Sequence, residues 1–220
     1  MPVVIKVGSN VATDERGAIR DEIVASIVGQ AVELHRSGTS VVLVTSGAIS
    51  RGIQLLGLAG RPSAMDELQA SSAVGQGQVY AAYDRIFGEH DIATGQILLT
   101  ANDFSARSTY VNAKQTLRKL LEWGVVPVIN ENDTTATDEI TFGDNDFRAA
   151  QVAILVGARR LVLATDIDAL YTADPGLDST ATRVARVDDF AELAALAIGD
   201  SASAIGSGFF FNDTATTEIY

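Results

Sequence analysis

Lys6 is the first residue of this sequence whose type suggests chemistry. It stands inside an otherwise apolar run, Val3–Val7, and an unpaired ammonium group is costly to bury. One interpretation is a lysine on an edge strand that points to water. The other is a cation that faces a cleft and stabilises the oxygens of a phosphoryl group during its transfer. Few lysines could fill that role, because the chain contains only two others, Lys114 and Lys119.

Two dense clusters of amides and carboxylates occur in the second half of the chain. Asn130-Glu131-Asn132-Asp133 follows a β-branched run, and Gly143-Asp144-Asn145-Asp146 precedes an alanine-rich helical segment. An Asx turn or a helix N-cap would explain one residue in each cluster. Two clusters so close together favour a ligand site, because these groups suit the ammonium and carboxylate of an amino acid, or Mg²⁺ held through water. The alternating stretch between them, Thr137–Gly143, is predicted to be a surface hairpin or flap.

Two shorter clusters add polar groups at other predicted strand ends. In Thr45-Ser46-Gly47-Ala48 a strand passes directly into a helix, and Gly47 would let backbone N–H groups approach an anion. The alternative for Ser46 is an ordinary N-cap, and the sequence leaves the two interpretations equally open. Thr165-Asp166 follows another apolar run.

A parallel sheet is the structure that would bring these clusters together. Apolar runs alternate with segments of helical period, and all of these runs except Gln96–Thr100 are typical of strands buried on both faces of a parallel sheet. The predicted strands are Val3–Val7, Val41–Thr45, Gln96–Thr100, Val125–Asn130 and Arg160–Thr165, and the predicted helices are Asp21–Arg36, Met65–Phe87, Arg107–Trp123 and Asp146–Val156. We therefore expect one α/β domain, a three-layer αβα sandwich with a mainly parallel central sheet. The polar clusters would meet at the carboxyl edge of that sheet, where open α/β sheets bind their ligands.

Composition and missing motifs exclude several other classes of protein. The chain of 220 residues has no cysteine and two histidines, which excludes disulfide scaffolds, thiol catalysis and the common zinc sites. A net charge of −12 argues against nucleic acid or an anionic membrane as a partner, and no apolar run is long enough for a membrane span. A P-loop, a dinucleotide-binding glycine motif and a nucleophile elbow are all missing from the sequence. The first residues show no export signal, so we expect a cytoplasmic protein.

Taken in order along the chain, the motifs resemble those of the glutamate 5-kinases in the amino acid kinase family. The likeness runs from about Val3 to Gly208, and the segments that carry it are Val4–Ser9, Val44–Ile49, Ala73-Val-Gly-Gln76, Pro127–Asp133, Gly143–Asp146, Thr165-Asp166, Leu170–Pro175 and Gly199-Asp-Ser201. The resemblance implies ATP-dependent phosphorylation of the side-chain carboxylate of L-glutamate to glutamyl 5-phosphate, the first step of proline biosynthesis, with Mg²⁺ required. Two alternatives stay open: a non-catalytic protein that senses glutamate or proline, and a related amino acid kinase with another acidic substrate.

The resemblance also implies roles for individual residues. Lys6 would act in catalysis and contact the phosphates of ATP, and Asp146 would orient the cationic groups. The residues implied in glutamate binding are Ser46, Gly47, Asn130, Asp133, Asp144 and Asn145, and those implied in nucleotide binding are Lys6, Thr165, Asp166 and Ser207. None is implied as a metal ligand. A homo-oligomer, and proline as a feedback inhibitor, follow from the resemblance alone.

The C-terminal segment departs from the pattern of the family. The resemblance implies a second catalytic lysine in a Gly-Gly-Met-x-Thr-Lys segment, but Phe209–Thr214 occupies that place and Asp213 stands near the lysine position. The sequence therefore predicts a kinase domain over residues 1–208, incomplete at its C-terminus, and a foreign tail over residues 209–220 that is artefactual or disordered. The missing lysine puts the activity of this chain in doubt.

Overall fold

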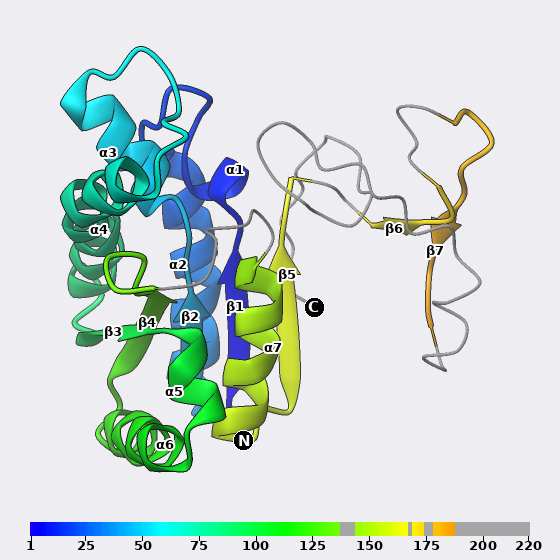
Figure 1. Cartoon of the computed structure of the whole chain (residues 1–220). Helices are drawn as coiled ribbons and strands as arrows, with labels where there is room; N and C mark the ends of the chain where they lie inside the picture. The colour runs from blue at the N-terminus through cyan, green and yellow to red at the C-terminus, as the bar shows by residue number, and fades with distance from the viewer. Residues whose placement is uncertain (137–143, 167–168, 174–177, 188–220) are drawn as a thin grey trace.

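The computed structural model describes residues 1–136, 144–166, 169–173 and 178–187. Its centre is a sheet (Figure 1) made of β1 (Val3–Val7), β2 (Val41–Val44), β3 (Thr94–Leu99), β4 (Val126–Glu131) and β5 (Arg160–Ala164). These strands lie in the order β3-β4-β2-β1-β5, and each neighbouring pair is parallel. The predicted α/β class with a mainly parallel central sheet is confirmed.

The register of the sheet brings the ends of the strands to one edge. Lys6 on β1 is level with Val44 on β2 and with Leu163 on β5. Val44 is in turn level with Ile129 on β4. Because these strands run in the same direction, the residues that follow these positions emerge at the same carboxyl edge.

Helices cover both faces of the sheet (Figure 1). The helices on one face are α2 (Asp21–Arg36) and α4 (Met65–Gly88), and those on the other are α6 (Arg107–Glu122) and α7 (Asp144–Val156). Successive side chains of a strand point to opposite faces, so Ile5 and Leu43 enter the first core while Val4 and Val42 enter the second. All residues of β1 and β2 are buried, as their near-continuous apolar runs predict.

The remaining described elements are short. They are α1 (Ser9–Ala12), α3 (Ala48–Leu56), α5 (Ala101–Ser105) and the antiparallel pair β6 (Leu170–Tyr171) and β7 (Arg183–Val184). Of these elements the sequence predicted only the start of α3. A helix of four or five residues is too short for a helical period to show.

Some predicted features lie outside the described residues or have shifted boundaries. β3 begins at Thr94 rather than at Gln96, and α7 begins at Asp144 rather than at Asp146. The predicted hairpin over 137–143 and the predicted tail over 209–220 lie outside the described residues. Among the helices of the described ranges, none combines the length and the apolar composition that crossing a membrane requires.

Candidate active site

Lys6 lies in a central strand, and its ammonium group is paired with Asp146. β1 is flanked by β2 and β5, so the interpretation of Lys6 as an edge-strand lysine is wrong. The residue is 9% exposed, and its Nζ lies 2.7 Å from Oδ1 of Asp146. A Cβ atom placed on Gly8 would lie 3.4 Å from that Nζ, so the ammonium group lies close to backbone that carries no side chain. Lys6 is therefore a buried cation with a carboxylate partner at the carboxyl end of β1.

Ser46 and Gly47 lie where β2 passes into α3. Gly47 is the N-cap of α3 and has a φ of 97°, a left-handed conformation that favours glycine. The N-cap interpretation of Ser46 is therefore wrong, and its Oγ instead accepts a hydrogen bond from Nδ2 of Asn145 in the first turn of α7. Oδ1 of Asn145 is buried and has no hydrogen-bond partner within the described part of the chain. Because a buried acceptor without a donor is unfavourable, this oxygen marks a place where a ligand could donate.

Two residues of α4 hold the side chains of Asn130 and Asp133. Nδ2 of Asn130 donates to Oε1 of Gln76 at 2.5 Å, and Oγ of Ser72 donates to Oδ2 of Asp133 at 2.7 Å. All four residues are buried. Within the cluster the local side-chain contact involves Asn132, whose Oδ1 accepts a hydrogen bond from the hydroxyl of Thr134 at 2.6 Å. Asn130 and Asp133 are thus fixed by long-range contacts and not by this local one.

Burial raises the pKa of Asp133 above its ordinary value, while the hydrogen bond from Ser72 and the positive charge of Arg61 oppose the rise. Burial likewise lowers the pKa of Arg61, and the charge of Asp133 opposes that change. Desolvation therefore dominates at both groups. A carboxylate in this setting would be stabilised further by a bound ammonium group, because an opposite charge nearby favours the ionised form.

Thr165 and Asp166 follow β5 at the same edge of the sheet. The carboxylate of Asp166 accepts a hydrogen bond from Nδ2 of Asn10 at 2.7 Å and another from the hydroxyl of Thr165 at 3.1 Å. The backbone N–H of Gly8 donates to the carbonyl of Ala164 at 3.0 Å. The segment after β5 is thereby joined to the segment after β1, on the side of the sheet edge away from β4.

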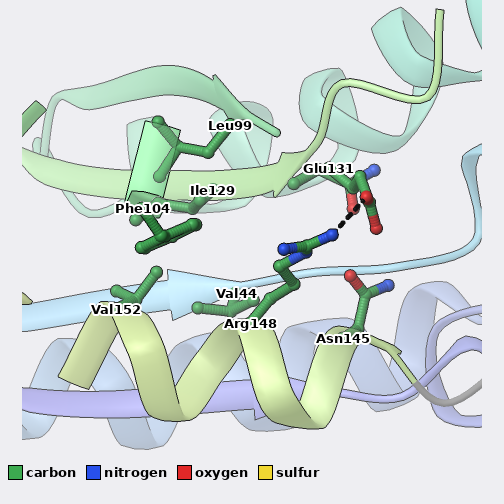
Figure 2. A pocket seen from close by; sticks show the side chains of 9 residues that line it. Val44, Leu99, Phe104, Ile129, Glu131, Asn145, Arg148 and Val152 are labelled. Carbon is green, nitrogen blue, oxygen red and sulfur yellow. Dashed lines mark hydrogen bonds and ion pairs between the residues drawn. The ribbon is translucent and has the colours of Figure 1, made fainter. Parts of the chain in front are cut away.

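A pocket beside Asn145 lies between β4, α5 and α7 (Figure 2). Phe104 contributes to its apolar wall, and Arg148 reaches towards Glu131 at its polar end. These two side chains form an ion pair with 2.9 Å between Nη2 and Oε1, and both are largely buried. Because Glu131 ends β4 and Arg148 belongs to α7, the pair links the strand that carries Asn130 to the helix that carries Asn145.

The described residues of the predicted site all lie at this carboxyl edge. Direct contacts join Lys6 to Asp146 and Asn145 to Ser46, and Asp144 begins α7. Ser207 lies outside the described residues. The contacts give the positions of these residues, and their roles in binding and catalysis stay predictions.

Five further residues beside the site received no role from the sequence: Asn10, Arg61, Ser72, Gln76 and Arg148. Gln76 belongs to one of the motifs that carry the family resemblance. Ser72 and Gln76 are four positions apart and so share one face of a helix, and two polar residues on a buried helical face are a signal that could have identified them. No such signal marks Arg61 or Asn10.

Comparison with known families agrees with this fold. The family model described as the amino acid kinase family matches residues 1–209. The chain belongs to the amino acid kinase family.

Three curated glutamate 5-kinases are similar to this chain. It is 44% identical to that of Dinoroseobacter shibae over 208 residues, 48% to that of Paraburkholderia xenovorans over 207 and 50% to that of Pseudomonas paraeruginosa over 208. These matches cover 94%, 94% and 93% of this chain but 56%, 55% and 55% of the relatives, so the chain spans about half their length. They confirm the resemblance inferred from the motifs.

A solved structure shows the same fold. The aspartate kinase from Synechocystis superposes with a TM-score of 0.61 at 19% identity, over 90% of this chain and 34% of that one. At this identity the likeness concerns the fold alone.

Proposed function

We propose that this chain is the kinase part of an enzyme that transfers a phosphoryl group from ATP to the side-chain carboxylate of L-glutamate, the first step of proline biosynthesis. One grouping at the sheet edge carries the proposal: the buried Lys6, paired with Asp146, beside amide and carboxylate groups placed for a small polar ligand. Glutamate 5-kinases at 44–50% identity support the choice of substrate.

The polar groups of the site suit the two ends of an amino acid. The carboxylate of Asp133 and the amide oxygens of Asn130 and Asn145 are acceptors, which suit an α-ammonium group. The backbone at Gly47 and the N-terminus of α3, a helix of nine residues, suit a carboxylate because N–H groups at a helix N-terminus attract anions. Ser46 directly precedes Gly47 in the chain and accepts a hydrogen bond from Asn145, so it links the two groups of residues.

The proposed reaction needs charge neutralisation more than it needs a base. The glutamate side chain has a pKa of about 4.3, so it is already an anion at neutral pH. One carboxylate oxygen forms a bond to the γ-phosphorus, and the bond from that phosphorus to the bridging oxygen breaks, with its electron pair leaving on ADP. Lys6 would stabilise the charge on the transferred oxygens, and Asp146, 2.7 Å away, would hold the ammonium group in place.

The nucleotide would lie on the β5 side of Lys6, against Thr165 and Asp166, and the family resemblance implies that Ser207 binds it as well. A Cβ atom at Gly8 would lie 3.4 Å from Nζ, so a side chain at this position would crowd the ammonium group that the proposal assigns to the phosphates. Within the described residues there is no group of three or more side chains able to ligate a metal. Mg²⁺ binds chiefly to phosphates and water with one or two carboxylates from the protein, and it would neutralise phosphate charge when bound.

The family resemblance supports four more parts of the proposal. They are a kinase domain over residues 1–208, a cytoplasmic location, a homo-oligomer, and proline as a feedback inhibitor.

The proposal is tested by ADP release in a coupled assay with L-glutamate, ATP and Mg²⁺, each omitted in turn. The 220-residue chain is compared with a form in which residues 1–208 continue into the C-terminal part of a relative. We expect ADP release that requires all three components in at least the extended form. Turnover of N-acetylglutamate or carbamate, with none of L-glutamate, would contradict the substrate.

A glutamate-sensing protein without catalysis is the second candidate, and Asp213 near the expected place of a lysine favours it. Titration calorimetry with L-glutamate and a non-hydrolysable ATP analogue separates the two candidates. Glutamate binding without turnover, even in the extended form, would support the sensor.

A further inference from the structure

We propose that Gln76 and Ser72 of α4 are positioning residues, which orient Asn130 and Asp133 so that both present acceptor oxygens to the ammonium group of the substrate. The inference rests on the proposed function, because it names residues that act through the glutamate-binding site. It would explain why the site binds an amino acid in preference to a dicarboxylate that lacks the ammonium group.

The first observation is a polar stripe on α4 that bonds to the segment after β4. Gln69, Ser72 and Gln76 are separated by three and four positions, so they lie on one face of the helix. Nε2 of Gln69 donates to the carbonyl of Ala136 at 3.0 Å, and the other two residues bond to Asp133 and Asn130. One face of α4 thus bonds to Asn130, to Asp133 and to the backbone of Ala136.

The second observation is that α4 is locked against α3, the helix that follows Ser46. A Cβ atom on Gly75 would lie 1.9 Å from the carbonyl oxygen of Ala48, and one on Gly52 would lie 1.7 Å from that of Ser71. The two helices therefore pack with their backbones in contact. Because Gly75 directly precedes Gln76, this packing fixes the stripe relative to the start of α3.

The third observation is the polarity of the two hydrogen bonds. Oε1 of Gln76 accepts from Nδ2 of Asn130, so Oδ1 is the amide atom left to contact a ligand. The hydroxyl of Ser72 donates to Oδ2 of Asp133, which leaves Oδ1 of that carboxylate. Two acceptor oxygens select a ligand that donates, and an ammonium group is such a donor. Without the acceptor at Gln76, the amide of Asn130 could rotate and present its NH₂ group to a cation.

The test compares two ligands that differ in the ammonium group. Binding of L-glutamate and of glutarate, which lacks that group, is measured by calorimetry on the 220-residue chain and on Gln76→Met and Ser72→Ala. A hydrogen bond contributes about 0.5–1.5 kcal/mol, so we expect glutamate affinity to fall about twofold to twelvefold in each variant. Glutarate affinity should change much less.

Two further variants separate orientation from mere support of the fold. Gln78→Met is the matched control, because Gln78 is exposed on the same helix, and it should leave both affinities unchanged. Gln76→Glu keeps an acceptor oxygen and should restore most of the preference for glutamate. Equal losses for glutamate and glutarate in Gln76→Met would overturn the proposal.

Failure of the proposed function would look different. If the parent chain binds no glutamate, the substrate assignment falls, and the orientation itself is judged by NMR on the ligand-free chain. There Gln76→Met should shift the side-chain amide resonances of Asn130, while Gln78→Met should not. Unshifted resonances in Gln76→Met would overturn the proposed pairing.

Discussion

Lys6 combines two properties that a catalytic cation needs. It is buried, so its charge acts in a medium of low dielectric constant, where electrostatic stabilisation is strong. It is also paired with Asp146 at 2.7 Å, so the ammonium group is already in place before a substrate arrives. The family resemblance already implied that Asp146 orients the cationic groups, and the structure adds the direct contact between Asp146 and Lys6.

Lys6→Ala should therefore lower kcat far more than it changes the KM for glutamate. Removal of one group that stabilises a transition state commonly reduces the rate by about 10²–10³. Steady-state kinetics on the active form of the chain measures both constants. Lys114→Ala is the control, because Lys114 is exposed on α6, and it should behave like the parent. Normal turnover in Lys6→Ala would remove the catalytic role.

Asp133, for which we propose a role in glutamate binding, opposes the stability of the fold through its burial. Burial raises its pKa, which means that the folded chain disfavours the ionised form relative to the unfolded chain. Below the unfolded pKa of about 3.9 both states are protonated and the penalty vanishes. The penalty grows as the pH rises through the interval between the unfolded and folded pKa values, and it persists at neutral pH.

Asp133→Asn should raise the midpoint of thermal unfolding by a few degrees at pH 7.5, and the gain should shrink towards pH 4. The same change should weaken glutamate binding, because it removes the negative charge offered to the ammonium group. Thermal unfolding at the two pH values and calorimetry measure the two effects. A lower midpoint at pH 7.5 would show that the contact with Ser72 and the charge of Arg61 outweigh burial.

At the scale of elements, the approach of α3 and α4 controls the site. Gly75→Ala would place a methyl group 1.9 Å from the carbonyl oxygen of Ala48, and overpacking of this kind typically destabilises a fold by about 1–3 kcal/mol. Because Ser46 lies at the start of α3, glutamate binding should weaken as well. Urea unfolding and calorimetry check these outcomes.

Gly77 supplies the control on the same helix. Beyond its chain neighbours and the backbone of its own helix, no atom of the described residues lies within 4 Å of a Cβ placed on Gly77, and alanine favours a helix over glycine by about 1 kcal/mol. Gly77→Ala should therefore stabilise the chain and leave glutamate binding unchanged. If Gly75→Ala proves as stable as Gly77→Ala, the two helices are not in backbone contact.

The sequence predicted the elements whose residues share one local pattern. β1 and α2 have the predicted bounds, because a continuous apolar run and a 3.6-residue period are read within a single segment. The contacts of Ser72 with Asp133 and of Asn10 with Asp166 could not be predicted, since they join residues 61 and 156 positions apart. Polar partners of this kind depend on how whole elements pack, and no local period records that packing.

At the scale of the whole molecule, the sheet order explains why so many separate segments form one site. β1 lies between β2 and β5, and β4 pairs with β2, so Lys6 stands between the segments proposed for glutamate and for the nucleotide. On one side of Lys6 the Arg148–Glu131 pair joins α7 to β4. On the other side the Asn10–Asp166 hydrogen bond joins the segment after β1 to the segment after β5. The site therefore requires the complete sheet, and it is not a property of any one loop.

The chain spans about half the length of the glutamate 5-kinases that it matches, and Asp213 stands near the place where the family resemblance implies a second catalytic lysine. Joining residues 1–208 to the C-terminal part of the Pseudomonas paraeruginosa relative should supply the second lysine that the resemblance implies. We expect kcat to rise by about 10²–10³ relative to the 220-residue chain. The KM for glutamate should change little, because Ser46, Asn130, Asp133 and Asn145 are present in both proteins.

Replacing the added lysine with methionine should return kcat towards that of the 220-residue chain, since a single charge near the transferred phosphoryl group is then lost again. Equal kcat values in all three proteins would show that the residues described here neutralise the transferred phosphoryl group without a second lysine.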